Sequence, residues 1–73
     1  MFVSRFSYYG RVFRIEHDGS LMPIIRLFEL YFKSYIRRAY WDPEDQNLLV
    51  FEFADGDEES VRLISYRKKR SRR

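Results

Sequence analysis

The last seven residues of the chain, RKKRSRR at 67–73, have the clearest capacity for chemistry, because six of them are cations and none is apolar. Clustered cations neutralise phosphate groups and make binding salt-dependent, and arginine also stacks on unpaired bases. The segment has no pattern for reading base edges, so any specificity must come from elsewhere. We therefore predict nucleic-acid contact at six positions: Arg67, Lys68, Lys69, Arg70, Arg72 and Arg73.

Two other interpretations of this segment stay open. A run of like charges without apolar residues cannot pack and repels itself, which predicts a disordered tail over 67–73. Such a tail can act only as a solubilising extension, or it can serve as a nuclear-import signal. Nucleic-acid contact remains the favoured interpretation.

The other charges are segregated along the chain. Residues 42–59 carry eight acidic and no basic side chains, whereas residues 1–41 carry seven basic and three acidic ones. We expect the acidic residues to gather at one end of the domain, either as solvated loops or as a docking patch for a basic protein surface. The DGDEE stretch at 55–59 lacks the twelve-residue spacing of an EF-hand, so we expect no calcium site.

A second candidate surface lies near the N-terminus, where Tyr8 and Tyr9 stand among arginines. Aromatic side chains interleaved with arginine stack bases or anchor protein interfaces. The sequence SYYGRVF lacks the spacing and the paired glycines of the RNA-recognition-motif signature. We therefore expect some of these aromatic residues to belong to the core and others to form an exposed surface that binds a protein partner. Together with the acidic residues, this predicts contact with a protein partner at eight positions: Arg5, Ser7, Tyr8, Tyr9, Arg11, Asp55, Asp57 and Glu58.

The sequence holds no recognisable catalytic or metal-binding constellation. His17 is the only histidine and there is no cysteine, so a metal site or a histidine-activated nucleophile has no companions. No glycine-rich phosphate loop occurs either. We therefore expect no enzyme, no catalytic residue, no metal and no cofactor. His17 fits the end of a strand beside a turn, and Trp41 fits a position that closes the core.

The element expected to organise the fold is a helix over Pro23–Trp41. Its apolar residues recur at helical spacing and form one broad arc: Ile24, Leu27, Phe28, Tyr31, Phe32, Tyr35, Ile36 and Ala39. Pro23 suits the first turn and Ser20 is the expected N-cap. Asp42-Pro43 should end the helix, because the residue before a proline avoids the α region. So wide an apolar arc must be covered, which favours packing against a sheet.

Strand signals stand on both sides of this helix. Aromatic and β-branched content predicts two hairpins: Phe2–Tyr9 with Arg11–His17, and Leu48–Ala54 with Ser60–Tyr66. An odd loop length in the second hairpin keeps Glu52 from facing Glu59, and a five-residue loop places Glu52 opposite Arg62. The predicted order is ββαββ. The predicted fold class is α+β, a small antiparallel sheet with one helix packed on one face.

The length of 73 residues allows one domain, which we predict over 1–66, followed by the basic tail at 67–73. A domain of this size buries only about 60% of its unfolded surface. The aromatic content of 19% compensates, because each ring buries a large area. No apolar run could span a membrane, and no signal-peptide pattern is present. We expect a cytoplasmic monomer.

In length and layout the chain resembles small phage-encoded proteins that bind host RNA polymerase, act as transcription antiterminators and inhibit promoter-dependent initiation. The resemblance rests on an aromatic-rich domain without cysteine and on the Arg/Lys-rich end RKKRSRR. It implies binding to the polymerase β′ subunit near the RNA exit channel. It also implies interference with sigma-dependent promoter recognition and suppressed RNA release at terminators. The basic tail would then lie near emerging RNA in the host cytoplasm.

Three hypotheses of function follow. A regulator that docks on a host nucleic-acid enzyme uses both the acidic and the basic residues, and a phage-type regulator of RNA polymerase is its favoured form. A stand-alone RNA- or DNA-binding module uses the tail and the basic side of the helix. An inhibitor of a nucleic-acid-binding effector uses the acidic residues as a phosphate mimic.

Overall fold

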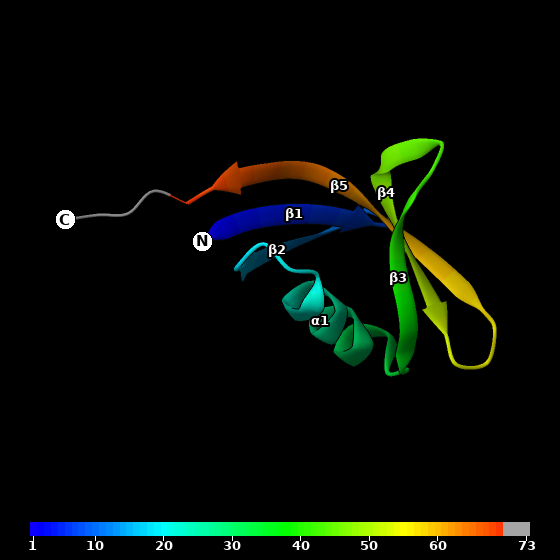
Figure 1. Cartoon of the computed structure of the whole chain (residues 1–73). Coiled ribbons are helices and arrows are strands. Elements are labelled where there is room, and N and C mark those ends of the chain that lie inside the picture. Colours follow the sequence, from blue (N-terminus) through cyan, green and yellow to red (C-terminus); the bar gives the residue numbers. More distant parts are fainter. Residues whose placement is uncertain (70–73) are drawn as a thin grey trace.

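The computed structural model describes residues 1–69, which form one antiparallel sheet with one helix on a single face (Figure 1). The elements follow the order ββαβββ: β1 (Phe2–Tyr8), β2 (Arg11–His17), α1 (Met22–Phe32), β3 (Ile36–Asp42), β4 (Asp45–Phe53) and β5 (Glu58–Lys68). The sheet order is β2-β1-β5-β4-β3. The predicted α+β class is confirmed, but the predicted ββαββ order omits a strand.

The prediction of a helix over Pro23–Trp41 is wrong in its second half. The helix ends at Phe32, where Lys33 adopts a left-handed conformation with φ 56° and its N–H bonds to the Glu29 carbonyl. The Glu29 carboxylate then accepts the N–H of Ile36 at 2.9 Å, which fixes the start of β3. The remaining residues up to Asp42 pair with β4 instead of continuing the helix.

The helix also begins differently from the prediction. Its N-cap is Leu21, which makes no side-chain capping bond, so the prediction of Ser20 as N-cap is wrong. The Ser20 N–H instead bonds to Asp18 Oδ1 at 3.0 Å. Asp18 and Ser20 therefore form a local turn that ends before the helix starts.

Both predicted hairpins are present. Tyr9 and Gly10 take φ values of 48° and 81°, the positive pair that a type I′ turn requires. In the second hairpin the Phe53 N–H donates to the Asp57 carbonyl, which leaves an odd loop, as predicted. The five-residue version of that loop is wrong, because Glu52 faces Glu58 rather than Arg62.

The charge of Glu52 is compensated from β3. Arg38 Nε lies 3.3 Å and Arg37 Nη2 3.8 Å from Glu52 Oε1. The sequence-based prediction could not include these partners, because it placed both arginines on the helix. The facing pair Glu52–Glu58 is therefore tolerated because arginines of β3, the strand that the prediction omitted, compensate the charge of Glu52.

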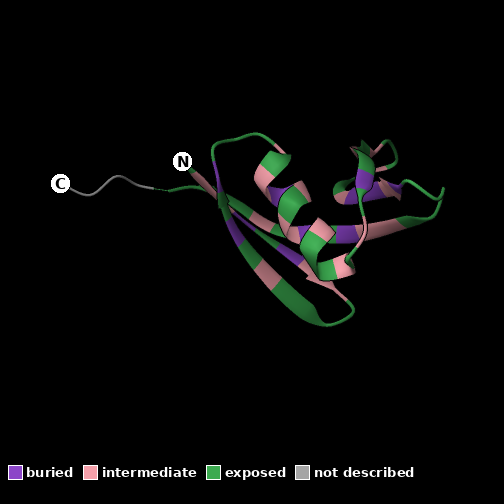
Figure 2. Ribbon diagram, turned by 90° about the horizontal axis from the view of Figure 1, so that it is seen from below, coloured by how far each residue is buried: buried purple, intermediate pink, exposed green. Residues whose placement is uncertain are grey.

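The core lies between the helix and the sheet, and its centre is aromatic. Phe6, Phe28 and Phe51 are fully buried. Phe28 meets Phe6 edge-on at 6.0 Å and Phe51 at 5.2 Å, so one helical ring joins β1 to β4. Buried and exposed segments alternate along the strands, as expected when only one face of a sheet is covered (Figure 2).

The sheet is strongly curved. Trp41 on β3 stacks on Phe6 of β1 with ring centroids 6.4 Å apart, although β4 and β5 separate these two strands in the sheet. Three flat strand spacings would place them about 14 Å apart. The face that carries the helix is therefore concave, and Trp41 reaches across it. The predicted place of Trp41 at the edge of the core is correct, but it projects from a strand.

The strand β5 extends through Lys68, and the Lys69 N–H donates to the Met1 carbonyl at 2.8 Å. A disordered tail that starts at Arg67 is therefore not confirmed for residues 67–69. The predicted contacts Arg70, Arg72 and Arg73 lie outside the described residues.

Candidate nucleic-acid interface

Five cations of residues 1–69 line one hollow, and one of them, Lys68, is in register with Phe2 at the end of β5. The other four lie on the face of the sheet that the helix leaves open: Arg5, Arg14, Arg67 and Lys69. Arg5 faces Arg14 on β2 and Ser65 on β5, whereas Val3 faces Glu16 and Arg67. Residues in register share one face of a sheet, and the intervening β1 residue Ser4 is buried on the helix side. These four residues, here called the cationic cluster, line a shallow hollow on the open face.

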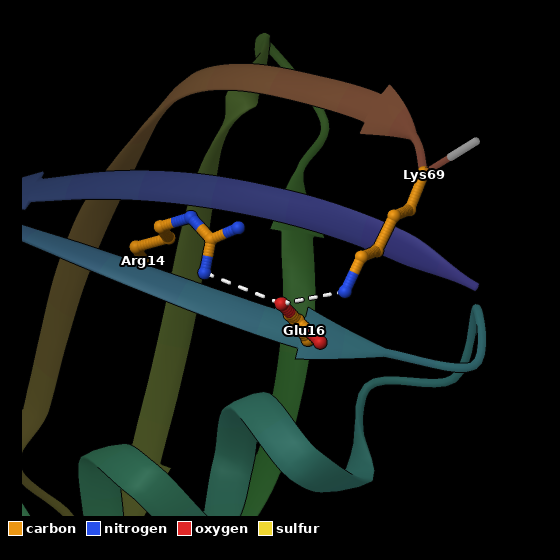
Figure 3. A network of polar contacts seen from close by, with 3 residues as sticks. All are labelled: Arg14, Glu16 and Lys69. Carbon is orange, nitrogen blue, oxygen red and sulfur yellow. Dashed lines mark hydrogen bonds and ion pairs between the residues drawn. The ribbon is translucent and has the colours of Figure 1, made fainter. Parts of the chain in front are cut away.

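One carboxylate lies in this cluster. Glu16 Oε2 is 3.1 Å from Lys69 Nζ and 3.3 Å from Arg14 Nη1, so it bridges β2 to the end of β5 (Figure 3). The hydrogen bond and charge of Lys69, with a smaller contribution from Arg14, lower the pKa of Glu16. Within residues 1–69, Arg5 and Arg67 form no ion pair. The cluster therefore keeps an excess of positive charge.

The other half of the open face is neutralised. Arg38 pairs with Glu52, and Arg62 Nη2 lies 3.0 Å from Asp45 Oδ2. The hydrogen bond from the Asn47 N–H lowers the pKa of Asp45 most, and the bond from Arg62 lowers it further. Asp45 therefore stays charged as the partner of Arg62. Positive charge without a partner is thus concentrated at the end of the face where β1 begins and β5 ends.

The acidic residues do not gather at one end, so that expectation is wrong. They divide between the β3–β4 turn and the β4–β5 turn, and β4 with its nine residues separates the two turns by about 30 Å. Several of them build the turns. Asp42 Oδ1 accepts the N–H groups of Glu44 and Asp45, and Asp55 Oδ1 accepts that of Asp57. The interpretation as ordinary turn residues therefore explains Asp42 and Asp55.

The residues predicted to contact a protein partner fall in several places. Arg5 belongs to the cationic cluster, and Ser7 shares its face. Asp55, Asp57 and Glu58 lie at or beside the β4–β5 turn. Tyr9 is 89% exposed at the β1–β2 turn.

The other two predicted contacts pack against neighbouring side chains. Arg11 stacks over the Tyr31 ring, with its guanidinium carbon 5.8 Å from the ring centroid. Tyr8 packs under the helix end, and its hydroxyl donates to Glu59 Oε1 at 2.9 Å. Burial is the main cause that raises the pKa of Tyr8 to about 12, and the bond to Glu59 is the second. Tyr8 therefore packs against the core, as expected for some of these aromatic residues.

The buried Ser4–His17 pair is not arranged for catalysis. His17 ends β2, as predicted, and its Nδ1 accepts the Gly19 N–H at 3.1 Å. Its proton must then sit on Nε2, which donates to Ser4 Oγ at 2.9 Å. A ring nitrogen that donates to the serine cannot also remove its proton. Elsewhere in residues 1–69, no group of three metal-ligating side chains gathers.

Comparisons with protein-family models, curated proteins and solved structures found no match. The function must therefore be inferred from the geometry of the chain. In the described part of the chain, no helix has the length and apolarity needed to cross a membrane. The most unusual chemical feature that remains is the cationic cluster.

Proposed function

We propose that the protein binds nucleic acid through the phosphate backbone, at the cationic cluster. The observation that carries this proposal is the placement of Arg5 directly opposite Arg14 on an exposed face, with Arg67 beside them and a single carboxylate among them. Facing like charges destabilise a strand pair by roughly 0.2–1 kcal/mol. A bound anion removes that repulsion, so the cluster is better suited to the complex than to the free protein.

The cluster fits phosphate rather than bases. Guanidinium groups form two parallel hydrogen bonds with phosphate oxygens, and three of the four cations are arginines. No aromatic ring lines this hollow within residues 1–69, so bases have no platform on which to stack. Four contacts to duplex DNA predict a slope of log K against log[salt] of about −3 to −4. Contacts by Arg70, Arg72 and Arg73, which follow in the sequence, would steepen it.

The experiment is a titration of the full chain against fluorescently labelled duplex and single-stranded DNA and RNA at several salt concentrations. Replacing Arg5→Gln or Arg67→Gln should weaken binding several-fold and reduce the salt slope by about one. Arg26→Gln is the matched control, because Arg26 is an exposed helical arginine on the other side of the sheet. Equal losses in all three variants, or binding without salt dependence, would contradict the proposal.

A second function, docking on a larger nucleic-acid enzyme, is favoured by the exposed Asp57 and Glu58 at the β4–β5 turn, which lies away from the cationic cluster (Figure 1). Complementary charge speeds association and fixes orientation. A regulator of host RNA polymerase would bind the enzyme at this turn and nucleic acid at the cluster. That regulator, with its effects on initiation and termination, stays a prediction.

The docking hypothesis is tested by affinity purification of the full chain from lysate with nuclease present. One large partner should remain bound, and the variant Asp57→Asn/Glu58→Gln should release it. Glu44→Gln is the control, because this exposed acid belongs to the other turn. A partner that nuclease releases would show indirect attachment through nucleic acid and would contradict docking.

A further inference from the structure

The helix covers only part of the concave face and leaves a pocket beside its first turn. The pocket has a volume of about 320 Å³ and is lined in part by Ser4, Phe6, His17, Trp41, Gln46 and Tyr66. This volume is at the lower end of the range of about 300–1,000 Å³ for small-molecule sites. The cationic cluster lies on the opposite face, so what occupies the pocket does not depend on the proposed function.

Aromatic rings border this pocket on two sides. Trp41 stacks on Phe6 with ring planes 21° apart. Tyr66 stacks on Phe2 at 5.3 Å, with ring planes 13° apart. Trp41 and Tyr66 remain 37% and 54% exposed, so each keeps a ring surface that a ligand can cover. Stacked rings of this kind favour a flat aromatic ligand over a branched aliphatic one.

A hydrogen-bond donor completes the pocket. Ser4 and His17 are 1% and 4% exposed, and the Nε2 proton of His17 occupies a lone pair of Ser4 Oγ. The hydroxyl proton of Ser4 is then left to donate. Among the hydrogen bonds of residues 1–69, it finds no protein acceptor. Buried donors normally have partners, so a ligand acceptor would satisfy this one.

From these three observations we propose that the pocket binds a planar aromatic ligand with a hydrogen-bond acceptor on its edge, the chemistry of a nucleobase or another nitrogen heterocycle. The ring lies between Trp41 and Tyr66, and its acceptor meets the Ser4 hydroxyl. Gln46 at the rim offers an amide to a second polar edge.

Indole and benzimidazole test this proposal, because they have the same shape and only benzimidazole has a ring-nitrogen acceptor. The NMR signal of the Trp41 indole N–H reports binding directly, since the chain has one tryptophan. Benzimidazole should bind about 3- to 10-fold more tightly than indole to the full chain. Equal affinities, or no saturable shift with either compound, would overturn the proposal.

Two variants and one control distinguish the loss of a ligand contact from a loss of folding. In Ser4→Ala the ratio of the two affinities should fall to about one, because the only ligand contact that is lost is the one to the ring-nitrogen acceptor of benzimidazole. The variant also removes the bond from His17 Nε2, which affects both compounds equally. Tyr66→Leu should weaken both compounds together, whereas Tyr9→Leu, an exposed tyrosine outside the pocket, should weaken neither. An unchanged ratio in Ser4→Ala, together with no loss in Tyr66→Leu, would refute the assigned contacts.

Adenosine and a single-stranded oligonucleotide distinguish the two sources of such a ring. A Trp41 shift with adenosine alone identifies a free small molecule as the ligand. A shift with both shows that the pocket also accepts a base within a nucleic-acid strand. A shift with neither overturns the nucleobase chemistry, even where nucleic acid binds the cationic cluster.

Discussion

Arg5 and Arg14 lie directly opposite one another across the β1–β2 pair, on the open face of the sheet. Glu16 pairs with Arg14, and within residues 1–69 no carboxylate pairs with Arg5. A protein selected only for stability would place an acid or a threonine at one of these positions. The repulsion instead coincides with the position where phosphate binding is proposed.

Replacing Arg5→Thr should therefore change stability and binding in opposite directions. Threonine favours strands and relieves the facing repulsion, so the free energy of unfolding should rise by about 0.2–1 kcal/mol. The affinity for duplex DNA at low salt should fall several-fold. Chemical denaturation and a binding titration on the same preparation measure both. A loss of stability would show that Arg5 has a structural role instead.

Replacing Glu16→Gln should strengthen nucleic-acid binding by a few-fold at low salt, because it removes the carboxylate from the cationic cluster. Glu44→Gln makes the same charge change at the β3–β4 turn and should have a smaller effect. Titrations of the two variants at one salt concentration suffice. Equal gains would indicate a dependence on net charge rather than on this site.

The ionisation of Glu16 also predicts a pH dependence. Lys69 and Arg14 lower the pKa of this carboxyl from 4.5, so its contribution to stability is present above that value and is lost as the pH falls through the folded pKa. Denaturation curves at a series of acidic pH values give the free energy of unfolding at each pH. This free energy should change less with pH in Lys69→Met than in the wild type. Identical curves would mean that the Glu16–Lys69 contact is not maintained in solution.

Tyr8 should ionise later than an ordinary tyrosine. Its pKa is raised to about 12, chiefly by burial and then by the bond to Glu59. A raised folded pKa gives stability that is present below about pH 10 and is lost as the pH rises through about 12. In a pH titration followed by tyrosinate absorbance, one phase should appear at higher pH than the others. Tyr8→Phe should remove this phase, and Glu59→Gln should shift it to a somewhat lower pH. A late phase that persists in Tyr8→Phe would contradict the assignment.

Replacing Lys33→Gly should stabilise the protein by about 1 kcal/mol. The left-handed conformation costs a residue with a side chain roughly 1–2 kcal/mol, and glycine adopts it freely. Leu30→Gly, at an exposed position inside the helix, should instead destabilise by about 1 kcal/mol. Thermal unfolding of both variants measures the contrast. Destabilisation in both would place Lys33 inside a longer helix.

The sequence predicted the hairpins well, because their signals are local. The turn at Gly10 and the loop near Gly56 set each register over a few residues. The strand β3 was missed because its pairing with β4 shifts register between Ile36 and Arg38. That irregularity breaks the alternation of apolar residues, so Ile36 and Ala39 also matched a helical period.

The candidate interface was harder to predict. The turn at Gly10 already implies that Arg5 faces Arg14, so this part could be inferred from local spacing. The place of Arg67 could not, because β1 pairs with a strand from the other end of the chain. Local patterns predict a hairpin, but they do not say which strand lies beside it. The predicted basic tail therefore included Arg67 and Lys69 but not the strand residues that lie beside them, and the contact of these residues with nucleic acid stays a prediction.

The position of β5 in the sheet has a consequence for synthesis. It lies between β1 and β4, so within residues 1–69 the N-terminal hairpin and the β3–β4 pair are joined into one sheet only through residues 58–68. Contacts between distant parts of a chain form slowly, because a long loop must close first. A nascent chain that ends before β5 carries Arg5 and Arg14 but has neither Arg67 nor Lys69 beside them. The complete cationic cluster therefore arises only after translation has passed β5 and Lys69.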